Sequence, residues 1–169
     1  MMAVVNEVTK EPFTILGFSD GGCVANKIAT MFPDRVKKMI TIGAGENIPG
    51  LKTIPSIKIA DLQKQDPEFV KEKLELCPEP DKLQNYLDVF SNFLSNELIS
   101  KNIFSKIQCP TLVIAGEVDS HAPLDTVINA YKMIPNAQLA IIVNGPHTVF
   151  HTNFEAVWSD IRPFLNISE

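Results

Sequence analysis

The sequence has 169 residues, the length of one domain, and its 45% hydrophobic and 21% charged residues are close to the average for globular proteins. Twenty acidic against fifteen basic residues give a net charge of −5, which argues against a nucleic-acid partner and against a polybasic membrane patch. No apolar run approaches the ~20 residues that a membrane span needs, so no membrane partner is expected either.

The N-terminal residues and the cysteines indicate a compartment. Residues 1–8 contain no basic region and no small-residue cleavage site, so no signal peptide is expected. Cys23, Cys77 and Cys109 are an odd number of widely spaced cysteines without the spacing of metal ligands. Reduced structural thiols in a cytoplasmic protein are the simplest interpretation.

The first third of the chain has the pattern of a βαβ unit. Phe13–Leu16 is an apolar run too short for a helix, which indicates a buried strand. After a glycine-rich turn, Cys23–Phe32 carries apolar residues at helical spacing, and Pro33 ends this helix. Val36–Ile42 gives the second strand. Strand, tight turn, helix and strand in this order predict parallel pairing.

The middle of the chain has a different pattern. Residues 48–104 hold two helix-like runs, Pro67–Leu76 and Asp81–Leu94, which are separated by prolines and contain no strand signal. We predict a helical insertion here, carried on a core domain made of residues 1–47 and 105–169.

The strand pattern resumes after the insertion. Thr111–Ala115 and Gln138–Val143 are predicted strands, with a helix over Leu124–Ile134 between them and a last helix over Asn153–Leu165. About four parallel strands with flanking helices make an α/β domain. In such sheets the chemistry lies beyond the carboxyl ends of the strands.

Three residues with catalytic chemistry follow three of these strands. Ser19 lies in a G-x-S-x-G turn between a strand and a helix, where Gly17 and Gly21 are expected because a Cβ would not fit. Asp119 follows the third strand and His147 the fourth. A serine becomes a nucleophile when a neutral imidazole takes its proton, and a carboxylate orients that imidazole. The order Ser, Asp, His therefore predicts a hydrolytic triad.

The two neighbours of Ser19 are expected at the oxyanion and substrate site. The backbone N–H of Asp20 lies at a helix N-terminus, where an oxyanion would form. The Asp20 carboxylate could bind a substrate ammonium group or cap the helix, and both interpretations stay open. Phe18 borders the same site from the strand side.

Other residues compete for these roles. His121 is a weaker candidate for the base, because it lies only two residues past Asp119 in the same loop. His151 is another, predicted on the first turn of the last helix. Cys23 is predicted to lie inside a helix, so we interpret it as buried packing and not as a second nucleophile.

Three motifs resemble the α/β-hydrolase fold family, most closely its small esterase-like members. They are Gly17-Phe-Ser-Asp-Gly-Gly22, the segment Cys109–Gly116 followed by Asp119, and Gly145-Pro-His147. The resemblance covers essentially the whole chain. It implies a serine nucleophile, an acid and a base in this order, a helical lid over residues 48–104, and no metal or organic cofactor.

The chain departs from the family pattern in one respect. The family has eight strands and its nucleophile follows the fifth, whereas Ser19 follows the first predicted strand. We therefore expect a truncated α/β-hydrolase fold without the front half, which supplies the second oxyanion donor and one wall of the pocket.

The expected function is a serine hydrolase that acts on a small ester, thioester or related acyl substrate through an acyl-enzyme. The alternative is a catalytically impaired remnant that serves as a binding or assembly module. A flavodoxin-like binding fold would instead place the three triad residues far apart.

Self-association is also expected. If the strands follow sequence order in space, Phe13–Leu16 is an edge strand that carries no proline or charge to prevent pairing. A homo-oligomer covering this strand is the expected solution, and covering by the inserted segment is the other route.

Overall fold

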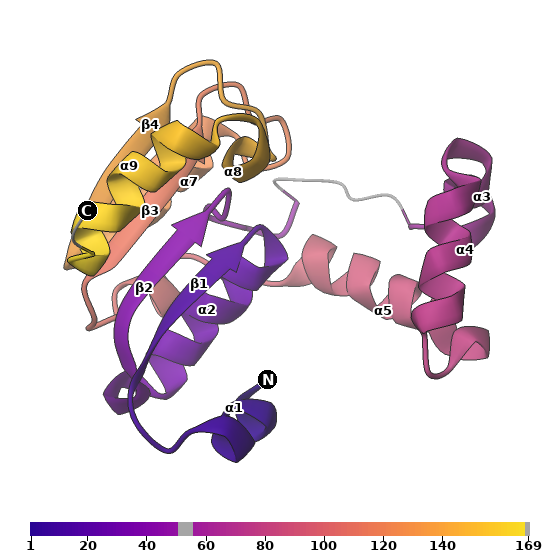
Figure 1. The fold of residues 1–169 in the computed structure, drawn as a ribbon, viewed down its shortest axis with the longest axis horizontal. Helices are drawn as coiled ribbons and strands as arrows, with labels where there is room; N and C mark the ends of the chain where they lie inside the picture. The colour runs from indigo at the N-terminus through magenta and orange to yellow at the C-terminus, as the bar shows by residue number, and fades with distance from the viewer. Residues whose placement is uncertain (51–55, 168–169) are drawn as a thin grey trace. The chain divides into compact units, whose positions relative to one another are not determined.

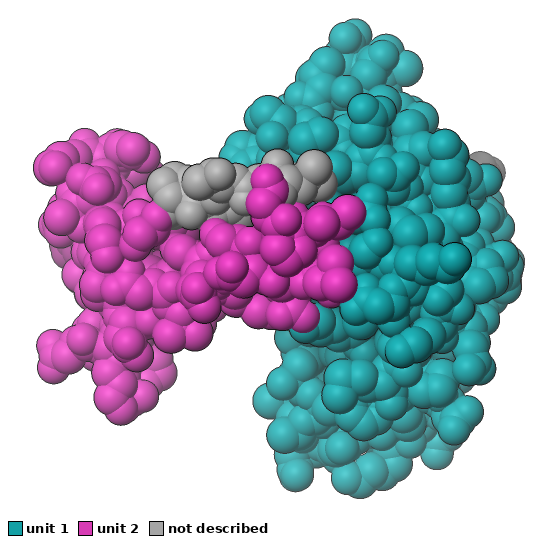
Figure 2. Space-filling model, turned by 180° about the vertical axis from the view of Figure 1, so that it is seen from behind, with its two compact units in different colours: residues 1–46, 99–169 teal, residues 47–98 magenta. Residues whose placement is uncertain are grey.

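The computed structural model describes residues 1–50 and 56–167. It divides into two compact units (Figure 2): unit 1 comprises Met1–Glu46 and Ile99–Glu169, and unit 2 comprises Asn47–Leu98. Residues 51–55, which fall within the predicted insertion, lie outside the described residues.

Unit 1 alternates strands and helices along the chain (Figure 1). Its elements are α1 (Met2–Val8), β1 (Phe13–Phe18), α2 (Asp20–Met31), η1 (Pro33–Arg35), β2 (Val36–Ile42), α6 (Lys101–Phe104), β3 (Thr111–Gly116), α7 (Leu124–Met133), β4 (Ala137–Ile142), α8 (Val149–Thr152) and α9 (Phe154–Leu165).

The described strands form one parallel sheet in the order β1-β2-β3-β4. Ile15 is opposite Met39 in the first pair, and Val113 is opposite Leu139 in the last. Every residue of β3 is buried, as expected for an inner strand of a parallel sheet that is covered on both faces. The predicted strand order is confirmed, and β1 lies at one edge of the sheet.

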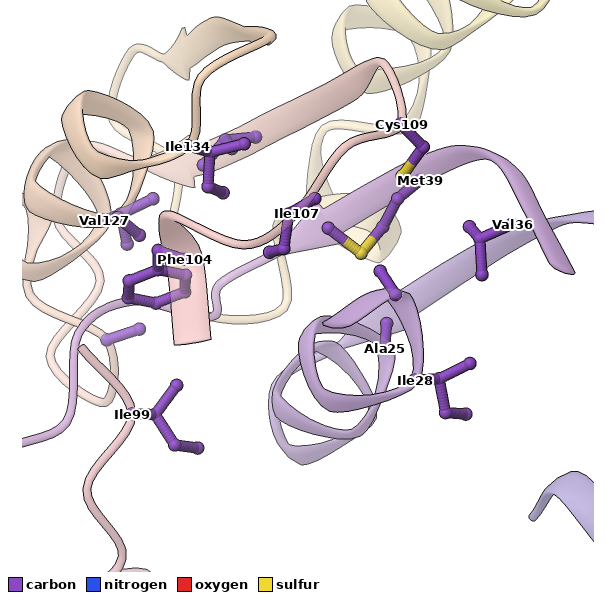
Figure 3. Close-up of a cluster of buried hydrophobic side chains, with 14 of the residues drawn as sticks. Ala25, Ile28, Val36, Met39, Ile99, Phe104, Ile107, Cys109, Val127 and Ile134 are labelled. Carbon is purple, nitrogen blue, oxygen red and sulfur yellow. The ribbon is translucent and has the colours of Figure 1, made fainter. Parts of the chain in front are cut away.

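Alternate side chains of each strand enter two separate cores, because successive residues of a strand point to opposite faces. Met39 and Val113 contribute to the core on the face covered by α2, α6 and α7 (Figure 3). Ile40 and Leu112 contribute to the core on the other face, covered by α8 and α9. The sheet is therefore the middle layer of three.

The segment just before β3 belongs to unit 1, although its sequence suggested the insertion. Ile99 is 1% exposed and Phe104 is fully buried in the same core as α2 and α7. The helix of Phe104, α6, packs against both of these helices. Its four residues are too few to show helical periodicity in the sequence, so this packing was missed.

Hydrogen bonds of Glu46 join the two segments of unit 1 that flank the insertion. The Glu46 backbone N–H donates to the Thr126 carbonyl (2.8 Å). The Glu46 carboxylate accepts hydrogen bonds from the Ser100 hydroxyl and from Asn129 Nδ2, the latter at 2.9 Å. Residues from both sides of the insertion are thus joined within unit 1.

Unit 2 consists of α3 (Ile59–Gln65), α4 (Pro67–Leu76), η2 (Pro80–Lys82) and α5 (Leu83–Asn96) in its described part. The predicted helix over Pro67–Leu76 is found with those bounds, since Asp66 caps it through Phe69 N–H (2.9 Å). The three α-helices line an apolar cavity of about 390 Å³.

One polar cluster joins the start of α3 to α5 within unit 2. The Asp88 carboxylate accepts hydrogen bonds from Lys58 (2.8 Å), Ser56 (3.0 Å) and Gln84 (3.0 Å). The Lys58 ammonium, followed by the Ser56 hydroxyl, holds the pKa of Asp88 below its ordinary value.

Within residues 1–50 and 56–167, no helix is both long enough and apolar enough to span a lipid bilayer.

Phe104 provides a test of the boundary between the units. We expect Phe104→Ala to lower the free energy of unfolding of unit 1 by about 3–5 kcal/mol, because it leaves a cavity in a closed core. Phe154→Ala is the matched control, since this aromatic residue of unit 1 is 55% exposed and should change the value by less than about 1 kcal/mol. Urea denaturation measures the free energy of unfolding of both variants. Equal losses would contradict the assignment of Phe104 to the core of unit 1.

Candidate active site

Ser19 is the only residue between the end of β1 and the start of α2. Its backbone has φ 51° and ψ −118°, a conformation that costs a non-glycine residue of the order of 1–3 kcal/mol. Its N–H donates to the Ile42 carbonyl (2.9 Å), and its own carbonyl accepts from the N–H of Gly22 (2.9 Å). These bonds hold the strained turn in place.

The glycines around Ser19 are required for different reasons. A Cβ at Gly17 would overlap the backbone of Gly21, so the predicted need for glycine at position 17 is confirmed. The same prediction for Gly21 is wrong, because a Cβ there would meet no atom within 4 Å. Gly22 takes that role, since a Cβ at Gly22 would overlap the Ala44 side chain.

Asp119 lies in the loop after β3 and its side chain is 1% exposed. Its Oδ1 accepts hydrogen bonds from the backbone N–H groups of His121 and Ala122, each at 2.8 Å. Two fixed N–H donors compensate the buried charge and prevent the carboxylate from turning. Oδ2 is therefore left facing His147.

His147 lies between the other two residues in one hydrogen-bonded chain. Its Nδ1 is 2.8 Å from Asp119 Oδ2, and its Nε2 is 3.0 Å from Ser19 Oγ. One tautomer satisfies both contacts: Nδ1–H donates to the carboxylate, and Nε2 accepts from the serine hydroxyl. His147 therefore lies within hydrogen-bond distance of both Ser19 and Asp119, whereas a flavodoxin-like fold was expected to place the three residues far apart.

Aromatic rings contact the His147 imidazole. The ring centroid of Phe18 is 4.8 Å away, and Phe18 itself packs edge-on against Phe150 at 4.6 Å. The His121 ring stacks on His147 with centroids 4.7 Å apart. The sequence placed Phe18 at the site, whereas Phe150 and this position of His121 were missed because ring contacts between residues distant in sequence leave no local pattern.

Gly43 is a further site residue that the sequence analysis missed. It follows β2 with φ +59°, and its N–H donates to the Ile114 carbonyl (3.0 Å). A Cβ at this position would lie 3.2 Å from Asp119 Oδ2 and 3.2 Å from His147 Nδ1. The sequence could have indicated Gly43, because it is a glycine at the carboxyl end of a predicted strand, where the site was expected.

The remaining candidates lie as follows. Asp20 is the first residue of α2, so its backbone N–H adjoins Ser19 and its carboxylate lies at the positive end of the helix dipole. His151 is exposed on the short helix α8 and not on the last helix as predicted, because Asn153 separates the two. Cys23 packs against the core that contains Met39, as predicted, but it is half-buried and not fully buried.

The strained turn gives a prediction that does not depend on catalysis. Ser19→Gly and Ser19→Ala both remove the hydroxyl, but only glycine relaxes a backbone with φ 51°. We expect the glycine variant to be more stable than the alanine variant by about 1 kcal/mol, after glycine's larger unfolded-state entropy is subtracted. Urea denaturation measures the difference, and a less stable glycine variant would show that the turn is unstrained.

Comparisons with known proteins show the family to which the sequence belongs. The family model described as "Serine hydrolase (FSH1)" matches residues 2–153. A poly(3-hydroxyalkanoate) depolymerase from Ectopseudomonas oleovorans is 31% identical over 173 residues, which cover 89% of this chain and 60% of the relative. Serine hydrolase BPHL from Mus musculus is 27% identical over 147 residues, covering 83% of this chain and 50% of the relative.

Solved structures agree on the fold. The enol-lactonase from Burkholderia xenovorans LB400 superposes with a TM-score of 0.73 at 16% identity, over 98% of this chain and 70% of that one. A meta-cleavage product hydrolase from Pseudomonas fluorescens IP01 gives 0.72 at 17% identity, over 98% and 68%. The chain spans 50–60% of the length of the first curated relatives it matches. With the parallel sheet and a family match over most of its residues, this chain belongs to the serine hydrolase family and carries part of the α/β-hydrolase fold.

Proposed function

We propose that this chain is a serine hydrolase that cleaves a small ester, thioester or related acyl substrate. The observation that carries the proposal is the hydrogen-bonded chain from Ser19 Oγ through His147 to Asp119 Oδ2, with distances of 3.0 and 2.8 Å. This is the arrangement that converts a weakly nucleophilic hydroxyl into an attacking group.

Each residue has one role in the proposed acylation. Ser19 Oγ attacks the acyl carbonyl carbon while its proton passes to His147 Nε2. Asp119 keeps the Nδ1–H of His147 oriented and stabilises the imidazolium that forms. The tetrahedral intermediate then expels the alcohol or thiol, which leaves with the proton from Nε2, and an acyl-serine remains.

Deacylation reverses the proton transfers. Water gives one proton to His147 Nε2 as its oxygen attacks the acyl-serine, and the Ser19 oxygen recovers that proton when the acid leaves. The net reaction consumes one water, needs no oxidant or reductant, and returns the triad to its starting state.

The proposed site stabilises the oxyanion with the backbone N–H of Asp20, next to Ser19 at the start of α2. Phe18 borders the substrate position while it packs against the base. A donor of this kind typically contributes ~10²–10³-fold to turnover.

The names of two relatives support an acyl–oxygen bond as the target. One relative is named a poly(3-hydroxyalkanoate) depolymerase and another a pimeloyl-[acyl-carrier protein] methyl ester esterase.

The described cysteines are free thiols, which fits the cytoplasmic location that we propose. Burial raises the pKa of the Cys109 thiol, which supports a structural role for it.

Hydrolysis of p-nitrophenyl acetate tests the proposed triad. We expect Ser19→Ala and His147→Ala each to lower turnover by ~10³-fold or to the uncatalysed rate, since the members of a triad act as one unit. His151→Ala is the matched control and should leave turnover unchanged, because this histidine is exposed on α8. Equal background rates for all proteins would favour a non-catalytic binding or assembly module.

We also propose that the chain forms a homo-oligomer through β1. This strand lies at one edge of the sheet, and its Leu16 is 53% exposed. An uncharged edge strand that exposes an apolar residue is a template for pairing with another chain. Two β1 strands related by a two-fold axis would cover each other.

Light scattering at micromolar concentration tests this assembly. We expect a dimer or larger oligomer, and Leu16→Lys should convert it to a monomer by placing a charge at the interface. Ile141→Lys is the matched control, because Ile141 is an exposed apolar residue of β4 at the opposite edge of the sheet. A wild-type monomer, or the same effect from both variants, would contradict the proposal.

A further inference from the structure

A third potential metal ligand lies beside the hydrogen-bonded chain. Asp119, His121 and His147 each offer one ligand atom, and these atoms all lie within 4.8 Å of one another. Two imidazoles and one carboxylate form a donor set that suits Zn²⁺ and similar transition metals. Mg²⁺ prefers sites built from oxygen alone, so this set discriminates against it.

The three residues differ in their freedom to move. The Asp119 side chain is 1% exposed and held by two backbone amides, while that of His147 is 17% exposed. His121 is exposed and stacks on the His147 ring. A tetrahedral site with metal–ligand bonds of about 2.0–2.2 Å needs donor atoms closer together than 4.8 Å. A rotamer change of the exposed His121 supplies this approach, and it gives up the ring stacking on His147 and the contact of Nδ1 with Ser120 Oγ (3.5 Å).

A metal bound by these residues would prevent the proposed reaction. Nδ1 of His147 bonds to Asp119 and Nε2 to Ser19, so both nitrogens of the base are already in use. A metal on Nε2 removes the acceptor of the serine proton. A metal on Nδ1, shared with Asp119, leaves the single ring proton of neutral His147 on Nε2, which then cannot accept the serine proton. Either position stops the transfer from Ser19.

We propose that Asp119, His121 and His147 form an inhibitory site for Zn²⁺ or a similar divalent transition metal, with His121 as the residue that distinguishes this site from an ordinary triad. The inhibitory effect rests on the proposed hydrolase function, whereas the binding itself does not. Binding is reversible and competes with the Ser19–His147–Asp119 hydrogen bonds.

Inhibition is measured by p-nitrophenyl acetate hydrolysis in increasing zinc chloride, with each variant normalised to its own metal-free rate. His121→Phe keeps an aromatic ring against His147 but has no donor nitrogen, and His121→Ala removes both. We expect the half-inhibitory zinc concentration to rise by about tenfold or more in both variants. It should stay unchanged in His151→Ala, which removes a different exposed histidine, and magnesium chloride should not inhibit.

Calorimetric titration of zinc into Ser19→Ala measures zinc binding independently of hydrolysis. We expect one zinc ion per chain, and adding His121→Phe to this background should weaken its affinity by about tenfold or more. Equal zinc affinity with and without His121 would overturn the proposal, as would unchanged inhibition of His121→Phe. If the wild-type chain hydrolyses nothing but the affinity still falls with His121→Phe, the metal site stands and the hydrolase function fails.

Discussion

The hydrogen bond between His147 and Asp119 joins two loops that follow neighbouring strands, and the rest of the site is arranged around it. Parallel pairing of β3 and β4 brings both loops to one end of the sheet, with Gly116 opposite Ile142. The loops also contact each other directly, since Val118 N–H donates to the Gly145 carbonyl at 3.0 Å. A Cβ at Gly116 would overlap that carbonyl. The register of the two strands thus sets the distance between Asp119 and His147.

Much of the sheet could be predicted from local sequence because its signals are local. The Val36–Ile42 strand has the predicted bounds, and the other strands differ from prediction by at most two residues at an end. Continuous apolar runs and glycines at their ends mark the strands of a buried parallel sheet. The order of Ser19, Asp119 and His147 could be predicted for the same reason, since each follows a recognisable strand.

Other features could not be predicted because they depend on contacts between residues distant in sequence. Phe104 enters the core through packing against α2 and α7, which no local pattern reveals. Gly22 is required only because Ala44, beyond the next strand, reaches the same place. Gly43 likewise matters because of a carboxylate and an imidazole from two later loops. These are properties of tertiary structure, and a single sequence does not show them.

The bond between Glu46 and Ser100 has a consequence for how this family can diversify. This hydrogen bond joins the two ends of the segment that carries unit 2. For the stability of unit 1, the whole segment therefore acts as one closed loop. The entropic free-energy cost of closing a loop grows only with the logarithm of its length, by about 0.6 kcal/mol for each doubling. Insertions of very different size and sequence can therefore occupy this position with little change in the stability of the sheet. Ser19, Asp119 and His147 all lie outside the segment, so the insertion can change while the hydrogen bonds among these three residues are kept.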